Sequence, residues 1–184
     1  MAVVVEEIER KTVWTIHKWK RYGDERDRQL HDLLHNRGLS IEECLRMGFE
    51  LEGIDKFQGN VLLNEGIQLL EDIITGLDTT SNKWDSDHAN LGVGNGTTSE
   101  NASQTGLQGT QTKYKGMDDG FPSRSGQTIS WRATFGDSEA NFAWEEFTVA
   151  NGDDNSAINL NRKVESKGTK SGGNWTLTLQ ITFS

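Results

Sequence analysis

Strict alternation of apolar and polar residues is the clearest pattern in this chain, and it covers residues 174–183. The apolar positions are Trp175, Leu177, Leu179, Ile181 and Phe183. The residues between them are threonines and a glutamine. Side chains of a β-strand point alternately to opposite faces, so this period predicts a half-buried antiparallel strand.

Further segments of strand character precede this one. We expect strands at residues 127–136, 140–150, 157–167 and 174–183, with connections rich in Gly, Asn and Asp. Regular short strands with such turns are typical of β-sandwiches and jelly-roll-like barrels. The pattern therefore predicts a mainly β chain, with an antiparallel β-sandwich or jelly-roll-like domain from about residue 88 onwards.

Helical spacing replaces this pattern in the first half of the chain. Apolar residues at i, i+3 and i+4 predict a helix that begins at Asp24 and stops at Gly38. Ser40 and Glu43 have the spacing of a capping box, which indicates the start of a second short helix. A broad apolar stripe predicts a third helix over residues 61–75.

Residues 1–22 fit neither pattern, and we call them the arm. Residues 13–19 are rich in β-branched and aromatic side chains, which favours an extended segment. The predicted organisation is therefore an extended basic and aromatic arm, a small helical region at 23–58, and a β-sandwich domain at 59–184. The helix at 61–75 leads into that domain.

Composition and charge narrow the function. Cys44 is the one cysteine in the 184 residues, so no intramolecular disulfide and no thiolate zinc cluster can form. No stretch approaches the roughly 18 apolar residues of a membrane-spanning helix, so we expect no membrane partner and no signal peptide. The net charge is −9, yet residues 10–21 carry +5 and residues 22–184 carry −11. Because the acidic body repels polyanions, we do not expect nucleic acid as a partner.

The arm combines its cations with two tryptophans. The candidate partner-binding residues are Arg10, Lys11, Trp14, Lys18, Trp19, Lys20 and Arg21. A tryptophan buried at an interface anchors a complex, whereas cations at the rim mainly steer association. We expect the arm to dock onto an acidic neighbouring subunit. The alternatives are that both tryptophans pack on the protein's own helices, or that they stack on single-stranded nucleic acid.

Residues with catalytic or metal-binding potential lack the partners that chemistry requires. His31 and His35 have i, i+4 spacing, but no third ligand follows in a matching motif. Cys44 lies beside apolar residues and is expected in the core. Glu145 and Glu146 are adjacent in a predicted strand, so they point to opposite faces. We therefore expect no enzyme, no cofactor and no metal.

Two loop motifs leave alternatives open. Trp84, Asp85 and Asp87 resemble part of a carbohydrate or calcium site, which would make the protein a host-glycan-binding module. The alternative for these aspartates is a turn in which the side chain binds its own backbone. The glycines of residues 92–96 suggest a phosphate loop, but no Lys-Ser/Thr follows, so we expect a turn.

Several motifs occur together in a fixed order. They are Gly59–Ile67, Ala89–Gly94, Gln104–Gly109, Trp131–Phe135, Ala140–Glu146 and Asn161–Glu165 with Gly168–Lys170. This combination, over about residues 59–184, resembles a family of structural proteins from the virions of tailed bacteriophages. The resemblance implies a non-enzymatic virion component, assembled in the host cytoplasm, that decorates or cements the capsid exterior, or serves in the tail, neck or fibre.

The same resemblance implies partners. These are the major capsid protein or other virion subunits, and jelly-roll virion proteins of this kind are often trimers. A closed homo-oligomer would also cover the strand edges of a sandwich, which otherwise present unpaired backbone groups.

Overall fold

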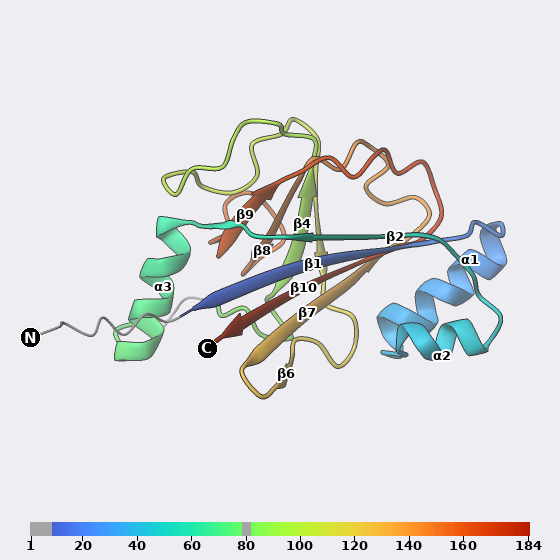
Figure 1. The fold of residues 1–184 in the computed structure, drawn as a ribbon, viewed down its shortest axis with the longest axis horizontal. Coiled ribbons are helices and arrows are strands. Elements are labelled where there is room, and N and C mark those ends of the chain that lie inside the picture. Colours follow the sequence, from blue (N-terminus) through green and yellow to red (C-terminus); the bar gives the residue numbers. More distant parts are fainter. Residues whose placement is uncertain (1–8, 79–81) are drawn as a thin grey trace, which may run out of the picture.

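Two antiparallel sheets form the centre of the computed structural model, which describes residues 9–78 and 82–184 (Figure 1). The first sheet has the order β2 (Leu51–Gln58), β1 (Arg10–Trp19), β10 (Trp175–Phe183), β7 (Thr128–Phe135) and β6 (Ser123–Ser125). The second has the order β3 (Val61–Leu62), β9 (Asn161–Val164), β8 (Glu146–Ala150), β4 (Asn90–Gly94) and β5 (Thr112–Gly116). The prediction of a mainly β chain is confirmed.

The main core lies between the apolar faces of these sheets. Trp14 of β1 stacks on Phe57 of β2, with ring centroids 6.1 Å apart, and lies 5.9 Å from the ring of Phe147 on β8. The predicted alternation of β10 holds at its centre, since Leu177 and Leu179 are fully buried in this cluster, whereas Thr176 is also buried and Phe183 is 38% exposed. Offset and tilted contacts between aromatic rings add to the stabilisation from burial alone.

The arm is the largest difference from the sequence prediction. Residues 10–19 are extended, as expected, but they form β1, which pairs with β10 on one side and β2 on the other. The physical reason is an alternation of Thr12, Trp14 and Ile16, all buried, with outward residues. The first sheet therefore includes residues 10–19 and 51–58, which the predicted division placed in the arm and the helical region.

The helices between Asp24 and Arg46, which we call the helical unit, lie at one end of the first sheet, and α3 lies at the other (Figure 1). α1 (Asp24–His31) continues as a π-helix, η1 (Asp32–Asn36), and α2 (Ile41–Arg46) follows. The N-cap of α1 is Gly23 and not Asp24. The capping box at α2 is confirmed, because Ser40 Oγ accepts from the N–H of Glu43 while Ser40 N–H donates to the Glu43 carboxylate.

A second apolar cluster holds this helical unit together. Its buried members are Trp19, Leu30, Leu33, Leu34, Cys44 and Phe49. Cys44 is a core residue, as expected, and burial raises the pKa of its thiol to about 11. Trp19 thus joins the helical unit to the end of β1.

The remaining elements follow the prediction with shifted bounds. α3 (Asn64–Thr75) begins later than expected because Val61 and Leu62 pair with β9. It ends at Gly76, whose left-handed backbone (φ 72°) is readily adopted by glycine. β8 and β9 are shorter than the predicted strands at 140–150 and 157–167. Within the described residues, no helix is both long and apolar enough to cross a membrane.

Candidate functional site

The cations of the predicted docking site are mostly engaged within the chain. Three of them form ion pairs, Lys18 with Asp55, Lys20 with Glu50 and Arg21 with Asp137, at 2.6, 3.1 and 2.9 Å. Arg10 donates to the carbonyl of Asn60 at 3.2 Å, whereas Lys11 is exposed on β1. Most of the positive charge is therefore balanced by this chain.

The tryptophans of that site are buried in the protein itself. Trp14 is 0% exposed and its Nε1 donates to the carbonyl of Gly59 at 3.2 Å. Trp19 is 1% exposed and its Nε1 donates to Thr176 Oγ1 at 3.0 Å. Both rings lie inside this chain, so the fold gives no support to their docking role, which stays a prediction. The alternative, that both pack on the protein's own helices, describes Trp19, which lies in the cluster of the helical unit, whereas Trp14 packs on strand residues Phe57 and Phe147.

The motif considered for glycans is also used internally. Trp84 is 8% exposed, and its Nε1 donates to the carbonyl of Ile158 at 3.3 Å. Asp85 Oδ1 accepts from the backbone N–H groups of Asp87 and His88, at 3.2 and 3.0 Å. This is the self-bonded turn that the sequence left open. Trp84 thus offers no open aromatic platform for a sugar.

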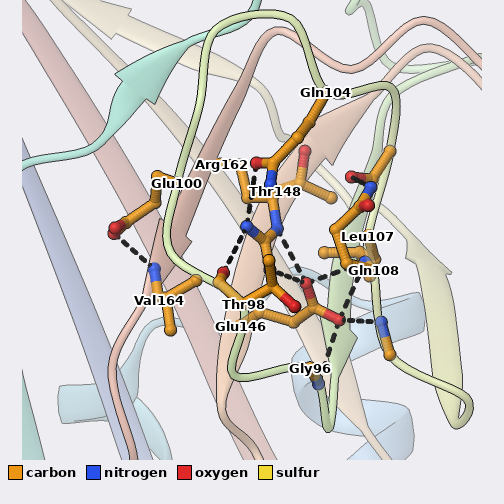
Figure 2. A network of polar contacts seen from close by, with 12 residues as sticks. Gly96, Thr98, Glu100, Gln104, Leu107, Gln108, Glu146, Thr148, Arg162 and Val164 are labelled. Atoms are coloured by element: carbon orange, nitrogen blue, oxygen red, sulfur yellow. Dashed lines mark hydrogen bonds and ion pairs between the residues drawn. The ribbon is translucent and has the colours of Figure 1, made fainter.

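A buried ion pair between neighbouring strands organises the loops at one end of the second sheet (Figure 2). Glu146 of β8 and Arg162 of β9 are both 0% exposed, and Arg162 Nη2 lies 2.6 Å from Glu146 Oε2. Glu146 Oε1 also accepts from the N–H groups of Gly96 and Gly109, at 3.1 and 2.6 Å. Gln108 N–H donates to the same carboxylate. One side chain thereby satisfies several loop donors.

Arg162 extends this network into the loop between β4 and β5. Its Nη1 donates to the carbonyl of Thr98 at 2.8 Å and to Gln104 Oε1 at 3.0 Å. Nearby, Glu100 Oε1 accepts from Val164 N–H at 2.7 Å. Figure 2 shows Gly96, Thr98, Gln104 and Gln108 of this loop around the pair, with the contact between Glu100 and Val164 to one side. The loop is therefore bound to the sheet by ionic and backbone contacts.

The glycines of residues 92–96 have a steric role in this network. A Cβ at Gly94 or Gly96 would lie 2.5 Å from Glu146 Oε1. At Gly92 a Cβ would meet the ring of Tyr114 at 2.7 Å. Residues 90–94 form β4, so the motif is largely a strand and not the turn that we expected. Its glycines give the buried carboxylate and the tyrosine ring room to approach the backbone.

A second buried ion pair attaches the helical unit to the first sheet. Asp118 is 0% exposed and its Oδ2 lies 2.8 Å from Arg132 Nε on β7. Asp118 Oδ1 accepts from the N–H of Thr134 at 2.8 Å. Arg132 Nη2 donates to the carbonyls of Leu34 and Leu39, at 3.2 and 2.9 Å. Arg132 thus satisfies carbonyls near the end of η1.

The two histidines considered for metal binding are used in this interface. His35 Nδ1 lies 2.9 Å from Asp118 Oδ1, and His31 Nε2 lies 3.1 Å from the carbonyl of Thr134. Their ring centroids are 5.1 Å apart. Burial, with the positive charge of Lys115, lowers the pKa of His31. Among the described residues, no group of three potential ligands is placed to hold a metal ion.

A polar cavity of about 360 Å³ opens between α1 and the loop that follows β7. Its walls include Asp27 and His31 from α1, Lys115 from β5, Glu139 from the loop, and Asn174 just before β10. Lys115 Nζ lies 2.9 Å from Glu139 Oε1. Sequence reasoning missed this cavity because its residues come from four distant segments, and His31 is the one lining residue that the sequence analysis had considered for binding, as a metal ligand with His35.

A second hollow is a groove of about 550 Å³ on the outer face of the first sheet, beside α2. Thr178 and Gln180 of β10 and Ser130 of β7 contribute its polar part. Its apolar part includes Leu45 and Ile54, which are 40% and 59% exposed. Apolar side chains beside polar ones are compatible with a protein-contact surface, which commonly has an apolar core and a polar rim.

Comparison with known proteins gives no relative from which a role could be transferred: no protein-family model, no curated protein and no solved structure matches the chain.

Proposed function

We propose that the protein is a non-enzymatic structural subunit of a tailed-phage virion, and that it contacts neighbouring subunits through the groove beside α2. The first part of the proposal rests on the sequence resemblance over residues 59–184. The observation that supports a contact role is the exposure of Leu45 and Ile54 in one groove. Decoration of the capsid exterior is the proposed position, with tail, neck or fibre as alternatives.

The groove has the features of a contact surface for an extended segment. Ile54 lies on β2, which is an edge strand of the first sheet, so the edge offers unpaired backbone groups beside the apolar side chains. Ile41 and Leu51 extend the apolar wall and are half-buried. A neighbouring subunit that adds a strand to β2 would gain backbone hydrogen bonds and cover Ile54.

The use of ionisable groups supports a role without catalysis. Glu146 and Arg162 satisfy each other and loop backbone groups, and Asp118 and Arg132 do the same at the helical unit. An active site instead arranges such groups around a space for a substrate. These pairs make rigid loops, which suits a subunit that must present a fixed surface.

We further propose a closed homo-oligomer, with a trimer favoured and the sandwich used in the jelly-roll-like manner of other virion proteins. Closure would cover the β2 edge in the free protein. Light scattering on the purified protein at micromolar concentration should give a mass above that of one chain. A monomer would refute the closed assembly, although not the presence of the protein in virions.

Incorporation into particles tests the function and the groove separately. When the gene for this protein is deleted from the phage and a tagged wild-type protein is expressed in the host, the tagged protein should be found in purified virions. The variants Leu45→Asp and Ile54→Asp should fold but be depleted from virions. Ile74→Asp is the matched control, because Ile74 is an 82% exposed isoleucine on α3.

The outcomes distinguish the virion role from the role of the groove. Absence of the wild-type protein from virions would refute the virion role. Normal incorporation of both groove variants would refute the groove as the contact surface. Equal loss for the Ile74→Asp control would show that any new surface charge disturbs assembly, which would also refute the groove.

A further inference from the structure

A buried carboxylate with no direct ion pair among the described residues lies in the wall of the polar cavity beside α1. Asp27 is 1% exposed, and within residues 9–78 and 82–184 its oxygens accept only backbone N–H groups, from Tyr22 at 3.2 Å and from Gly23 at 2.9 Å. It forms no ion pair with any residue that the structure describes. Buried carboxylates are normally paired with a cation, because an isolated charge is poorly solvated there. Asp27 therefore favours a positively charged neighbour.

An unpartnered acceptor lies in the same wall. Asn174 is 0% exposed and its Nδ2 donates to the carbonyl of Asp27 at 2.9 Å. Its Oδ1 is buried and accepts no hydrogen bond from the described part of the chain. A buried polar atom of this kind is costly unless a donor reaches it. Asn174 and Asp27 thus both favour a donor in the same place.

The ionisable side chains that line the cavity are mostly acidic. Four carboxylates line it, Asp24, Asp27, Asp137 and Glu139, against two permanent cations, Arg28 and Lys115. Lys115 is already paired with Glu139, and Asp137 is paired with Arg21. Asp24 is exposed at the rim and makes no ion pair among the described residues. Asp24 and Asp27 lack a direct ion pair among the described residues, and Arg28 and the buried ammonium of Lys170, which interacts electrostatically with Asp27, offset part of their charge.

Two of the lining carboxylates have a pKa below the usual value; for Asp137 the main cause is the N–H of Gly173. Burial by itself would raise the pKa of Glu139, but the N–H of Gly136 and the ammonium of Lys115 outweigh it and hold that pKa below its usual value. Burial lowers the pKa of His31, so its ring adds no positive charge at neutral pH. The ionised forms of Asp137 and Glu139 are thus favoured, while His31 adds little opposing charge.

We propose that this cavity binds a small organic cation, a primary ammonium or a guanidinium group, whose N–H groups donate to Asn174 Oδ1 and to the Asp27 carboxylate. The volume of about 360 Å³ lies within the usual range for small-ligand sites. The cation could be a free amine, or the side chain of a lysine or arginine on another protein. Both sources present the same chemistry, and both are independent of the proposed virion role.

Calorimetric titration of the purified full chain tests the site. Putrescine serves as the free amine, and lysine blocked at both backbone ends serves as the side-chain probe. We expect saturable binding of at least one of these. Butanediol, a neutral analogue of putrescine, should not bind. Putrescine alone indicates a free amine, and equal binding of blocked lysine indicates a protein side chain.

Substitutions then locate the binding. Asp27→Asn should weaken binding by at least about tenfold, the scale expected for a buried charge pair. Asp24→Asn, at the exposed rim, should weaken it by up to about fivefold. Asp87→Asn is the control, because Asp87 is exposed and does not line the cavity. Should Asp27→Asn fail to fold, amide NMR of the wild-type protein replaces it, with shifts expected at Asp27, His31 and Gly136.

Three results would overturn the proposal. One is the absence of heat and of amide shifts with both amine probes at millimolar concentration. Another is equal binding of butanediol, which would show that charge plays no part. The third is a loss of affinity in Asp87→Asn as large as that in Asp24→Asn, which would indicate attraction by net charge only.

Discussion

Replacing Arg162 with methionine should strongly destabilise the fold, because it leaves Glu146 buried without its cation. Both side chains are 0% exposed, so water cannot solvate the remaining carboxylate. Breaking one partner of such a pair costs about 3–5 kcal/mol. That is a large part of the roughly 5–15 kcal/mol that stabilises an ordinary domain. For a chain of this size, the melting temperature should fall by about 6–20 °C.

Urea denaturation followed by tryptophan fluorescence measures the free energy of unfolding. Lys20→Met is the matched control, since the Lys20–Glu50 pair is 46% and 63% exposed. An exposed pair is worth about 0–1 kcal/mol, so this control should hardly move the midpoint. A loss below about 1 kcal/mol for Arg162→Met would refute the reasoning, because a buried pair would then behave like a surface pair.

A double replacement separates the ion pair from the loop contacts. Removing both charges from a buried pair is often close to neutral. Here the variant Glu146→Leu with Arg162→Met should stay destabilised, because the N–H groups of Gly96, Gln108 and Gly109 lose their acceptor. Each unsatisfied buried donor costs about 1–3 kcal/mol. Full recovery in the double variant would show that these backbone contacts contribute little.

Three further predictions concern other parts of the fold. Gly96→Ala should cost about 1–3 kcal/mol by overpacking, because its Cβ would lie 2.5 Å from a buried carboxylate oxygen. Gly116→Ala, whose nearest contact is 3.7 Å, should unfold in urea nearly as the wild type does, and equal losses would contradict this. Burial lowers the pKa of His17 and His31 from 6.5, so below about pH 6.5 the unfolded chain binds more protons and stability should fall. Melting curves from about pH 7 to 5 should show that fall, and the variant with glutamine at both positions should lack it. Asp118→Asn should cost about 3–5 kcal/mol and speed amide exchange in α1 more than in β10, and uniform acceleration would argue against local release of the helical unit.

The sequence pattern predicted an element correctly where the element depends mainly on its own residues. The strand at 175–183 and the Ser40–Glu43 capping box both form as predicted, although Thr176 is buried and Phe183 is exposed. β1 was misjudged because its buried alternation, Trp14 and Ile16, is short and is bordered by cations. Those cations indicated an exposed segment, yet most of them are balanced by residues far away in the sequence.

The candidate sites depend on such distant contacts. Glu146 is 16 positions from Arg162 and 50 positions from Gly96, so its local sequence reveals neither partner. The closely spaced glycines at 92–96 were a usable signal, since glycine inside a strand often marks a close approach. Asn174 and Asp27 are 147 positions apart and meet only through the sheet and helix packing, so no local signal could pair them.

The position of β1 beside β10 has a consequence for synthesis of the chain. Trp19 and Thr176, which are hydrogen-bonded, are separated by 157 positions. At about 5–20 residues per second, β1 waits roughly ten to thirty seconds for its neighbour to leave the ribosome. During that time Trp14 and Ile16 have β2 as their only partner strand in the first sheet. The nascent chain therefore exposes apolar strand surface for most of its synthesis, and its yield in a cell should depend on chaperones that bind such segments.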